Sequence, residues 1–357
     1  MKILHVITGL GVGGAERVVM EVAPRMRALG HNVSVVSLGT DSRILDQYDS
    51  TDVPIFLLKI NKSNPLSLLK GLFSFLRLLR KGSFDVVHAH MFHALVFSVL
   101  ARIVLLAKPA LFFTSHNFSG FKGGRRRFIQ FTRFARDGDV VFALGQHASL
   151  NTKNVFLIPN GVAVEASVLT KERECESDAF TFVFVGRLET QKDPLTLVRQ
   201  FSQLSKSNVR LLIVGDGYLR QEVEAEVARL GLNNKIDLLG VRTDVKAILT
   251  MADCFVMSSR WEGLPMAILE AGAVGLPVIS TNVGAVSEIL DGDCGWITDS
   301  ASLHKGMQYV VENREEARRR GARLRNKVVE RYSVESNVRS HLKAYATVCA
   351  NGGQNAT

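Results

Sequence analysis

Short apolar runs alternate with longer amphipathic segments along most of the chain. Runs rich in Val, Ile and Phe are typical of strands buried on both faces, whereas apolar residues three to four positions apart are typical of helices. In the first half this pattern predicts strands at residues 3–8, 32–38, 55–58, 85–90, 111–115, 140–144 and 155–158. It predicts helices at residues 15–29, 65–81 and 93–106. Strands that alternate with helices in this way indicate parallel βαβ units and a doubly wound sheet.

The same alternation restarts after a polar, acidic stretch at residues 163–179, which we interpret as a linker. Strands are predicted at residues 180–185, 209–214, 235–239, 254–258 and 277–281, with helices at 194–206, 218–230 and 245–251. A further helix is expected to start at Leu264 or Pro265, and the tail is expected to be helical from residue 303 to about 350. We therefore expect an α/β protein with two Rossmann-like domains, residues 1–163 and 164–335. Because ligands of open α/β sheets bind beyond the carboxyl ends of the strands, both domains should face one central cleft.

Composition limits the class of protein. A length of 357 residues suffices for two ordinary domains, and 46% hydrophobic with 22% charged residues is typical of a soluble globular protein. The four cysteines lie far apart without a CxxC pair, so we expect reduced thiols in a cytoplasmic protein. No stretch reaches the roughly 20 apolar residues that span a bilayer, and the first apolar run is too short for a signal peptide.

The positive charge is concentrated in the first half of the chain. Residues 1–165 contain 20 Lys and Arg against 10 Asp and Glu, whereas residues 166–357 contain 24 of each. Residues 59–81 and 118–136 are basic and free of acidic residues. A helical wheel of the first run separates a polar strip (Ser67, Lys70, Ser74, Arg77, Lys81) from an apolar half (Leu66, Leu69, Leu72, Phe73, Phe75, Leu76, Leu79).

These two basic runs predict an anionic partner, and an anionic membrane surface suits an amphipathic basic helix. The protein would then be peripheral on the inner face of the membrane. The alternative is that both apolar faces pack on the sheet while the cations are merely solvated. We do not expect nucleic acid as the partner, because the basic runs contain no recognisable nucleic-acid-binding module.

A glycine-rich loop follows the first strand and opens a helix. Gly9, Gly11 and Gly14 satisfy the GxGxxG pattern of dinucleotide sites, and Asp41 ends the second strand, where a ribose-binding acid can lie. An NAD(P)-dependent oxidoreductase is therefore one alternative function. The same glycines also serve any ligand whose phosphate or sugar approaches the backbone closely.

Residues 260–279 carry two carboxylates in different settings. Glu262 lies on a loop, and Glu270 lies inside the helix that follows. The start of that helix, near Gly263 and Leu264, offers free backbone donors and a positive dipole end to an anion. A sugar nucleotide matches both features. Its hydroxyl pairs can bond to the two carboxylates, and its diphosphate can bind at the start of the helix.

Arg187 and Lys192 follow the first strand of the second half. Two cations at the carboxyl end of a strand can neutralise a diphosphate without a metal ion. The sequence also offers His88 and His90, which share one face of a strand. No carboxylate or cysteine completes a zinc site near them, so we expect His88 to be structural and His90, at the strand end, to be able to contact a ligand.

Two DGD sequences resemble metal motifs, at residues 137–139 and 291–293, but both have the composition of ordinary turns. His116 ends another strand of the first half, at the expected cleft. We therefore predict no metal site.

Taken together, these motifs resemble retaining glycosyltransferases of family four, also called group 1 glycosyl transferases. The resemblance rests on GGAE at 13–16, on VGR followed by Lys192, and on SSRWEGLPMAILEAGAVGLPVI with its two glutamates eight positions apart. It covers nearly the whole chain and implies the GT-B fold, in which a last helix, here about 336–350, returns to the first domain, so that residues 336–357 pack there. One departure is Ala163, where an aspartate is common.

The resemblance implies a role for each matching residue of the second domain. Glu270 would hold the ribose hydroxyls, and Glu262 would contact hydroxyls of the transferred sugar. Arg187 and Lys192 would bind the diphosphate and stabilise the departing nucleotide. Recognition of the base by backbone groups is expected near Val241.

In the first domain, the resemblance implies that Gly13 and Gly14 approach the donor through backbone amides and that His116 faces the donor sugar. The implied enzyme is a metal-independent glycosyltransferase that needs no cofactor and uses a UDP- or GDP-linked sugar. Its acceptor would be lipid-linked or a growing cell-surface polysaccharide. A catalytically silent subunit that only binds a sugar nucleotide is a second alternative.

Overall fold

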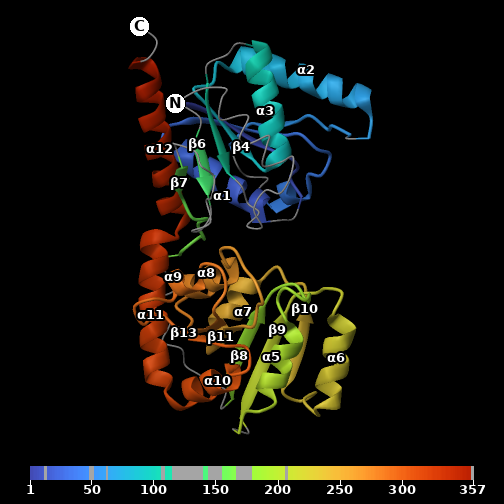
Figure 1. Ribbon diagram of the computed structural model, residues 1–357, viewed down its shortest axis with the longest axis vertical. Helices are drawn as coiled ribbons and strands as arrows, with labels where there is room; N and C mark the ends of the chain where they lie inside the picture. Colours follow the sequence, from blue (N-terminus) through green and yellow to red (C-terminus); the bar gives the residue numbers. More distant parts are fainter. Residues whose placement is uncertain are drawn as a thin grey trace. The chain divides into compact units, whose positions relative to one another are not determined.

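The computed structural model describes residues 1–11, 14–47, 52–61, 63–105, 109–114, 140–143, 155–165, 179–205 and 208–354 (Figure 1). The chain divides into two compact units. Unit 1 comprises Met1–Gly161 and Val334–Thr357, and unit 2 comprises Val162–Ser333. The sequence had suggested boundaries after residues 163 and 335.

Unit 1 is built on a parallel sheet with the strand order β3-β2-β1-β4-β5-β6-β7 (Figure 1). The strands are β1 (Lys2–Ile7), β2 (Asn32–Ser37), β3 (Ile55–Leu57), β4 (Val86–His90), β5 (Ala110–Thr114), β6 (Val140–Ala143) and β7 (Val155–Leu157). Almost every described residue of β1, β2, β4 and β5 is buried, which explains their uninterrupted apolar runs.

Helices cover both faces of this sheet. The helices of unit 1 are α1 (Gly14–Ala28), α2 (Pro65–Gly82), α3 (Phe92–Leu105) and α12 (Val334–Gln354), with a short 3-10 helix at Arg43–Gln47. Ile3 and Ile7 of β1 pack in one cluster with residues of α1 and α12, whereas Leu4 and Val6 pack in another with residues of α2 and α3. Because successive side chains of a strand point to opposite faces of the sheet, β1 contributes to the hydrophobic core on each face. Since α12 packs on α1, the C-terminal helix returns to the first domain, as predicted.

Unit 2 repeats the architecture with a parallel sheet of order β10-β9-β8-β11-β12-β13 (Figure 1). The strands are β8 (Phe180–Val185), β9 (Val209–Val214), β10 (Ile236–Gly240), β11 (Cys254–Met257), β12 (Val278–Thr281) and β13 (Trp296–Thr298). In this order β9 and β10 are added on one side of β8, and β11, β12 and β13 on the other, so the strand order reverses between β8 and β11. In a doubly wound sheet the carboxyl ends of the two strands at such a point are the expected ligand site.

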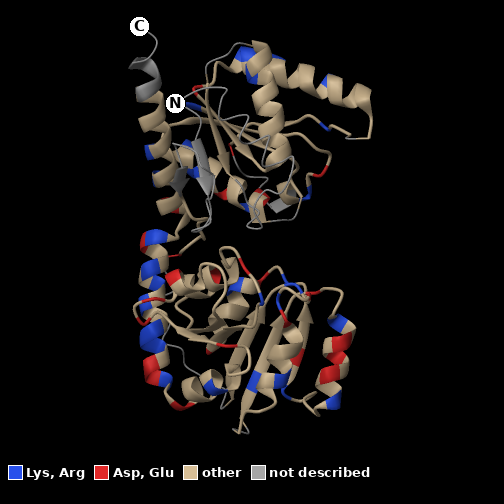
Figure 2. Cartoon of the chain, in the orientation of Figure 1, with Lys and Arg blue, Asp and Glu red and all other residues tan. Residues whose placement is uncertain are grey.

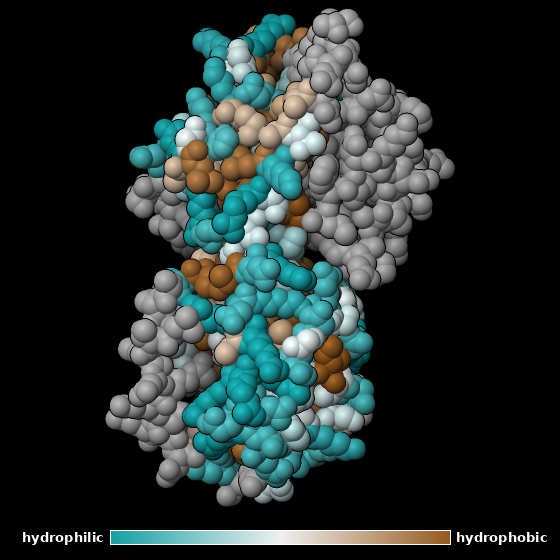
Figure 3. All heavy atoms as spheres, turned by 90° about the vertical axis from the view of Figure 1, so that its left-hand side faces the viewer, coloured by the Kyte–Doolittle hydropathy of each residue, from teal (hydrophilic) through white to brown (hydrophobic). Residues whose placement is uncertain are grey.

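The helices of unit 2 form two groups that share different hydrophobic clusters. One group is α5 (Pro194–Phe201), α6 (Arg220–Arg229) and α10 (Leu303–Glu312). The other is α7 (Val245–Met251), α8 (Met266–Ala273), α9 (Val286–Ile289) and α11 (Arg314–Arg331). Charged residues are dense along α11, and the face of unit 2 seen in Figure 3 is accordingly hydrophilic (Figure 2).

Several predicted boundaries were wrong by one or more residues, and three helices illustrate this. Helix α8 begins at Met266, because Pro265 is the N-cap residue with φ −74° and ψ 96°, not the first helical residue. Helix α5 ends at Phe201 because the N–H groups of Gln203 and Leu204 bond to carbonyls three residues earlier, in turn geometry. Helix α12 begins at Val334, slightly before the predicted start. The pattern did not reveal β13, α9 or the 3-10 helix, all of which are too short for periodicity to register.

Among the described helices, none is both long enough and apolar enough to cross a membrane.

Candidate functional site

Two residues predicted to bind a ligand meet at the carboxyl edge of the unit 2 sheet. Lys192 follows β8 and Glu262 follows β11, and the Lys192 Nζ donates a 2.6 Å hydrogen bond to Glu262 Oε1 across 70 residues of sequence. The Lys192 and Glu262 side chains are only 16% and 7% exposed. The structure therefore joins the predicted diphosphate cation to the predicted sugar carboxylate in one largely buried ion pair.

The two loops that carry this pair are held together by backbone contacts. Ser258 Oγ donates to the carbonyl oxygens of Lys192 and Asp193, at 2.9 and 3.0 Å. The Arg260 backbone N–H bonds to the Gln191 carbonyl, and its Nε donates a 2.7 Å bond to Asp193 Oδ2. Asp193 is buried and adopts a left-handed conformation with φ 48°, which such surrounding contacts can maintain.

A third loop, after β12, closes the other side of the Glu262 loop. Thr281 Oγ1 donates a 2.6 Å bond to the Ser259 carbonyl, and the Ala285 N–H donates to the Gly263 carbonyl. Gly284 has φ +58°, and a Cβ built on it would lie 2.4 Å from the Gly263 carbonyl oxygen. Close backbone approach therefore requires glycine at this position.

Helix α8 begins beside the ion pair. In the described part of the chain, the backbone N–H groups of Gly263 and Leu264 donate no hydrogen bond, and Pro265 provides no side-chain cap. Unused donors at the positive end of a helix can bind an anion. Glu270 lies one turn into α8 and is partly buried, so the two carboxylates differ in setting as predicted.

Two other predicted residues of unit 2 lie on exposed loops. Arg187 is 65% exposed, and its guanidinium contacts Glu189 at 2.9 Å and Gln191 at 3.4 Å. Val241 follows β10 and is 79% exposed. Its backbone is held in place because the Gly240 carbonyl accepts a 2.8 Å bond from the Gly215 N–H.

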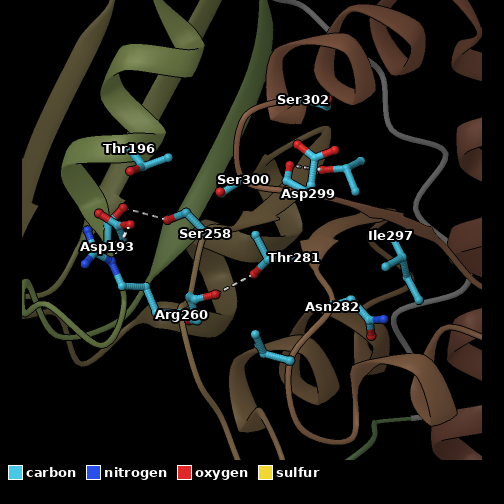
Figure 4. Close-up of a pocket in the computed structure, with 13 residues that line it drawn as sticks. Asp193, Thr196, Ser258, Arg260, Thr281, Asn282, Ile297, Asp299, Ser300 and Ser302 are labelled. Atoms are coloured by element: carbon cyan, nitrogen blue, oxygen red, sulfur yellow. Dashed lines mark hydrogen bonds and ion pairs between the residues drawn. The ribbon is translucent and has the colours of Figure 1, made fainter.

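An open pocket of about 970 Å³ lies along the same edge, and Figure 4 shows its lining. Asp193 and Thr196 come from the start of α5, and Ser258 and Arg260 come from the loop after β11 (Figure 4). The loop after β11 also contributes Ser259. The remaining lining residues lie at the ends of β12 and β13 and in the loops that follow these strands: Thr281, Asn282, Val283, Ile297, Thr298, Asp299, Ser300 and Ser302. The sequence analysis assigned no role to these hydroxyl-rich loops, because single Ser and Thr residues in loops carry no spacing signal.

Unit 1 contributes fewer described candidates. Gly14 opens α1, whereas Gly13, His116 and the basic run at 118–136 lie outside the described residues. Asp41, the candidate ribose acid, lies against the glycine loop, where its carbonyl accepts from the Leu10 N–H. Its carboxylate pairs with the Arg43 guanidinium, and these hydrogen bonds lower the pKa of Asp41.

A cluster of buried histidines lies inside unit 1, facing α1 and α12. Ring nitrogens of His5, His88 and His90 lie within 4.8 Å of one another. His5 Nδ1 and His90 Nε2 share a hydrogen bond of 3.0 Å. His88 bonds to the Tyr345 hydroxyl at 2.6 Å and to Thr114 Oγ1 at 2.8 Å. These contacts support a structural role for His88. His90 is 3% exposed and borders a small cavity, and its contact with a ligand stays a prediction.

The sequence analysis missed His5 as a member of this cluster. It is brought there by the strand register, because β1 and β4 pair in parallel with His5 opposite His88, and the sequence pattern does not fix that register. The cluster borders a small cavity of about 10 Å³, roughly the space of one water molecule, which His341 also lines. Burial is the main cause that lowers the pKa of His5 to about 3 and of His341 to about 4, so both are neutral near pH 7.

Comparison with known proteins identifies the family. The family described as "Glycosyltransferase Family 4" matches residues 12–166, and "Glycosyl transferases group 1" matches residues 169–327. The UDP-Gal:alpha-D-GlcNAc-diphosphoundecaprenol alpha-1,3-galactosyltransferase of Escherichia coli is 27% identical over 79% of this chain and 80% of its own length. A GalNAc-alpha-(1->4)-GalNAc-alpha-(1->3)-diNAcBac-PP-undecaprenol alpha-1,4-N-acetyl-D-galactosaminyltransferase of Campylobacter jejuni is 26% identical over 88% of this chain and 89% of its own length.

Among solved structures, a glycosyltransferase from Rickettsia africae superposes with a TM-score of 0.83 over 98% of this chain and 99% of its own, at 22% identity. This likeness confirms the predicted GT-B fold. With two family matches that together span nearly the whole chain, the oxidoreductase alternative based on residues 9–14 is displaced. The chain belongs to the family-four, group 1 glycosyltransferases, and it is a retaining enzyme that uses a nucleotide sugar.

Proposed function

We propose that this enzyme transfers a sugar from a UDP-linked donor to a lipid-linked glycan acceptor of the undecaprenyl diphosphate type, in the assembly of a surface polysaccharide. The observation that carries the donor proposal is the Lys192–Glu262 pair beside the free N–H groups at the start of α8. The names of the Escherichia coli and Campylobacter jejuni relatives, which include undecaprenol-linked sugars, support the acceptor class.

In this proposal the donor lies along the carboxyl edge of unit 2. The diphosphate meets Lys192, Arg187 and the N–H groups of Gly263 and Leu264. Glu262 binds a hydroxyl of the transferred sugar, Glu270 binds the ribose, and the backbone near Val241 contacts the base. The resemblance adds Gly13, Gly14 and His116 from unit 1 as further donor contacts.

The reaction follows from these groups. The bond between the anomeric carbon and the β-phosphate oxygen breaks, and UDP keeps the electron pair. The acceptor oxygen bonds to the same face of the anomeric carbon, and its proton passes to the departing phosphate. Negative charge grows on that phosphate, so the cations and free N–H groups lower the barrier by stabilising it. We propose that no metal ion is needed, because these groups neutralise the diphosphate.

Helix α2 supports a peripheral position on an anionic membrane. It packs through Gly71, Phe75 and Leu79, which are buried, and exposes the opposite stripe to solvent. The exposed stripe, at helical spacing of three to four residues, comprises Leu66, Leu69, Lys70, Phe73, Arg77, Arg80 and Lys81. Three of its apolar side chains are 64–71% exposed: Leu66 at 68%, Leu69 at 64% and Phe73 at 71%.

Such a stripe combines apolar side chains at its start with cations at its end, and Figure 2 shows α2 free of acidic residues. The helical wheel had placed Leu66, Leu69 and Phe73 in the apolar half, and in the structure these three side chains do not pack on the sheet, as the solvated-helix alternative required, but are exposed. Apolar side chains inserted at the interface, with about 1 kcal/mol from each nearby cation, suffice for reversible docking on anionic lipid. Docking would bring the enzyme to an acceptor that is anchored in the bilayer.

The test is a thermal-shift screen of UDP- and GDP-linked sugars, followed by an assay of nucleotide release with an undecaprenyl diphosphate-linked sugar as acceptor. We expect a UDP-sugar to raise the melting temperature, and UDP to be released with a product that keeps the anomeric configuration of the donor. If a sugar nucleotide raises the melting temperature but no nucleotide is released with any acceptor, the result would favour the catalytically silent binding subunit. Stabilisation by GDP-sugars alone would overturn the choice of UDP.

A further inference from the structure

Glu262 presents its two carboxylate oxygens to different surroundings. Both of its donors, Lys192 Nζ at 2.6 Å and Ser259 Oγ at 2.7 Å, bond to the same oxygen, Oε1. Among the described residues no donor reaches Oε2. Two donors on one oxygen fix the plane of the carboxylate and leave the other oxygen as an unused acceptor.

The two hydrogen-bond donors to Glu262 Oε1 behave differently in the proposed reaction. Lys192 is expected to turn its ammonium toward the diphosphate of the nucleotide sugar, because the two negative charges of a diphosphate attract a cation more strongly than the one charge of a carboxylate. Ser259 carries no charge, and among the described residues its hydroxyl bonds to Glu262 alone. Once the UDP-sugar binds, the Ser259 hydroxyl is therefore the hydrogen-bond donor that still holds Glu262 in place.

Ser259 is itself rigidly placed. It is 1% exposed, and its carbonyl accepts a 2.6 Å bond from Thr281 Oγ1. Its neighbours are fixed as well, because Ser258 Oγ bonds to the Lys192 and Asp193 carbonyls and the Arg260 N–H bonds to the Gln191 carbonyl. The Ser259 hydroxyl thus projects from a backbone that is anchored to the loops after β8 and β12.

We propose that Ser259 is the positioning residue for Glu262, holding Oε1 so that Oε2 faces a hydroxyl of the donor sugar. The proposal rests on the proposed donor site. It makes Ser259 a determinant of how the enzyme distinguishes an intact UDP-sugar from UDP, since UDP lacks the group that Glu262 contacts. It also predicts that Ser259 acts only through Glu262.

The experiment measures the affinities of UDP and of the preferred UDP-sugar by calorimetry for wild type, Ser259→Ala, Glu262→Gln and the double variant. For Ser259→Ala we expect UDP affinity to stay within about twofold, while UDP-sugar affinity falls about tenfold, the effect of one hydrogen bond to a charged group. In the Glu262→Gln background, Ser259→Ala should add no further loss, because the group it positions is already changed.

Ser258→Ala is the matched control, since Ser258 bonds to backbone carbonyls and does not contact Glu262. Ser258→Ala should therefore change the affinities for UDP and for the UDP-sugar by the same factor. Ser259→Thr, which keeps a hydroxyl, should restore the preference for UDP-sugar, and melting temperatures identify a variant that is merely unfolded.

Equal losses of UDP and UDP-sugar affinity in Ser259→Ala, or no loss of either, would overturn the positioning role. So would an additive loss in the double variant. If wild type binds no UDP-sugar at all, it is the proposed function that fails, and the two failures are therefore distinguishable.

Discussion

Lys192 and Glu262 bond directly to each other at 2.6 Å, so each already has a partner before any substrate arrives. Both side chains are largely buried, and a lone charge in such a place is costly. The pair therefore keeps both buried charges compensated in the ligand-free protein. A diphosphate would replace Glu262 as the partner of Lys192, while a sugar hydroxyl would bond to the freed carboxylate.

Arg187→Ala should lower turnover without disturbing the fold. The Arg187 side chain is 65% exposed, and among the described residues its guanidinium contacts only side chains of its own loop, so its loss should leave the melting temperature nearly unchanged. If it stabilises charge on the departing phosphate, kcat should fall by roughly two to three orders of magnitude. The assay is the rate of UDP release, and unchanged turnover would remove Arg187 from the site.

Arg210→Ala is the matched control for that variant. Arg210 lies on β9, is 53% exposed and pairs with Asp237, away from the loops that carry the candidate site. Its replacement should leave turnover within a small factor of wild type.

Gly284→Ala should destabilise unit 2 and weaken donor binding. The new Cβ would meet the Gly263 carbonyl oxygen at 2.4 Å, and φ +58° is strained for alanine. We expect a loss of about 2–3 kcal/mol in the free energy of unfolding, together with weaker UDP-sugar binding. Urea denaturation followed by tryptophan fluorescence reports on this unit, because Trp261 and Trp296, both in unit 2, are the two tryptophans of the chain.

Gly231→Ala separates steric conflict from backbone strain. Gly231 also has a positive φ, +67°, but nothing lies within 4 Å of the added Cβ. It should therefore cost only about 1 kcal/mol and leave donor affinity unchanged. If both variants behave alike, the close approach of Gly284 to the Glu262 loop has no energetic importance.

Phe73→Ser combined with Leu69→Ser should reduce membrane binding and leave the fold intact. Both side chains are mostly exposed, so the stability of the protein should change little. Withdrawing each from the lipid interface costs about 1.5–3 kcal/mol, which corresponds to at least tenfold weaker partition per residue. Co-sedimentation with vesicles of mixed neutral and anionic lipid measures the partition.

Leu29→Ser provides the control, since Leu29 is 59% exposed just beyond the end of α1 and lies outside the α2 stripe. Raising the salt concentration should weaken binding of the wild type, because screening reduces the contribution of the cations. Binding that is indifferent to lipid charge, or equal in the α2 and Leu29 variants, would contradict the membrane proposal.

Unit 1 should lose stability as the pH falls below about 6.5. Burial lowers the folded pKa of His5 to about 3 and of His341 to about 4, whereas the unfolded chain binds protons near 6.5. Between these pKa values the unfolded state binds more protons than the folded state, so the free energy of unfolding rises with pH. The stability that the two neutral histidines contribute is fully present above pH 6.5. His88, His90 and Tyr345 surround the two groups and add no carboxylate.

Replacing His341 by Gln tests this dependence. The slope of unfolding free energy against pH between 5 and 6 should decrease by about 1 kcal/mol per pH unit relative to wild type. Far-ultraviolet circular dichroism follows both units, and tryptophan fluorescence, which follows unit 2, should show no change of slope. Identical slopes in the two proteins would mean that His341 is not buried in its neutral form.

The fold followed from the sequence wherever a segment was long and regular. Strands β8 and β9 lie at their predicted positions, since each apolar run has clear polar limits. The three residues of β13 were invisible because so short a run has no measurable period. For α2, the wheel separated polar from apolar positions, but only the packed neighbours reveal that Phe75 is covered and Phe73 is not.

The site was predictable in its residue types and only partly in its contacts. Strand ends placed Lys192 and Glu262 at one edge of the sheet, and spacing alone could not say that they bond to each other. Ser259 belongs to the segment that carries the family resemblance, but it was assigned no role, because its proposed role depends on the direction of a single hydroxyl. His5 would have required the register of β1 against β4, which the alternation of side chains does not fix.

The most direct test is an experimental structure of the enzyme with a bound UDP-sugar. The account predicts that Lys192 Nζ leaves Glu262 and lies within hydrogen-bond distance, about 3 Å, of a phosphate oxygen. Glu262 Oε2 should bond to a sugar hydroxyl while Oε1 keeps Ser259, and Glu270 should bond to the ribose. A nucleotide bound elsewhere, or a donor sugar that leaves the Lys192–Glu262 pair intact, would contradict it.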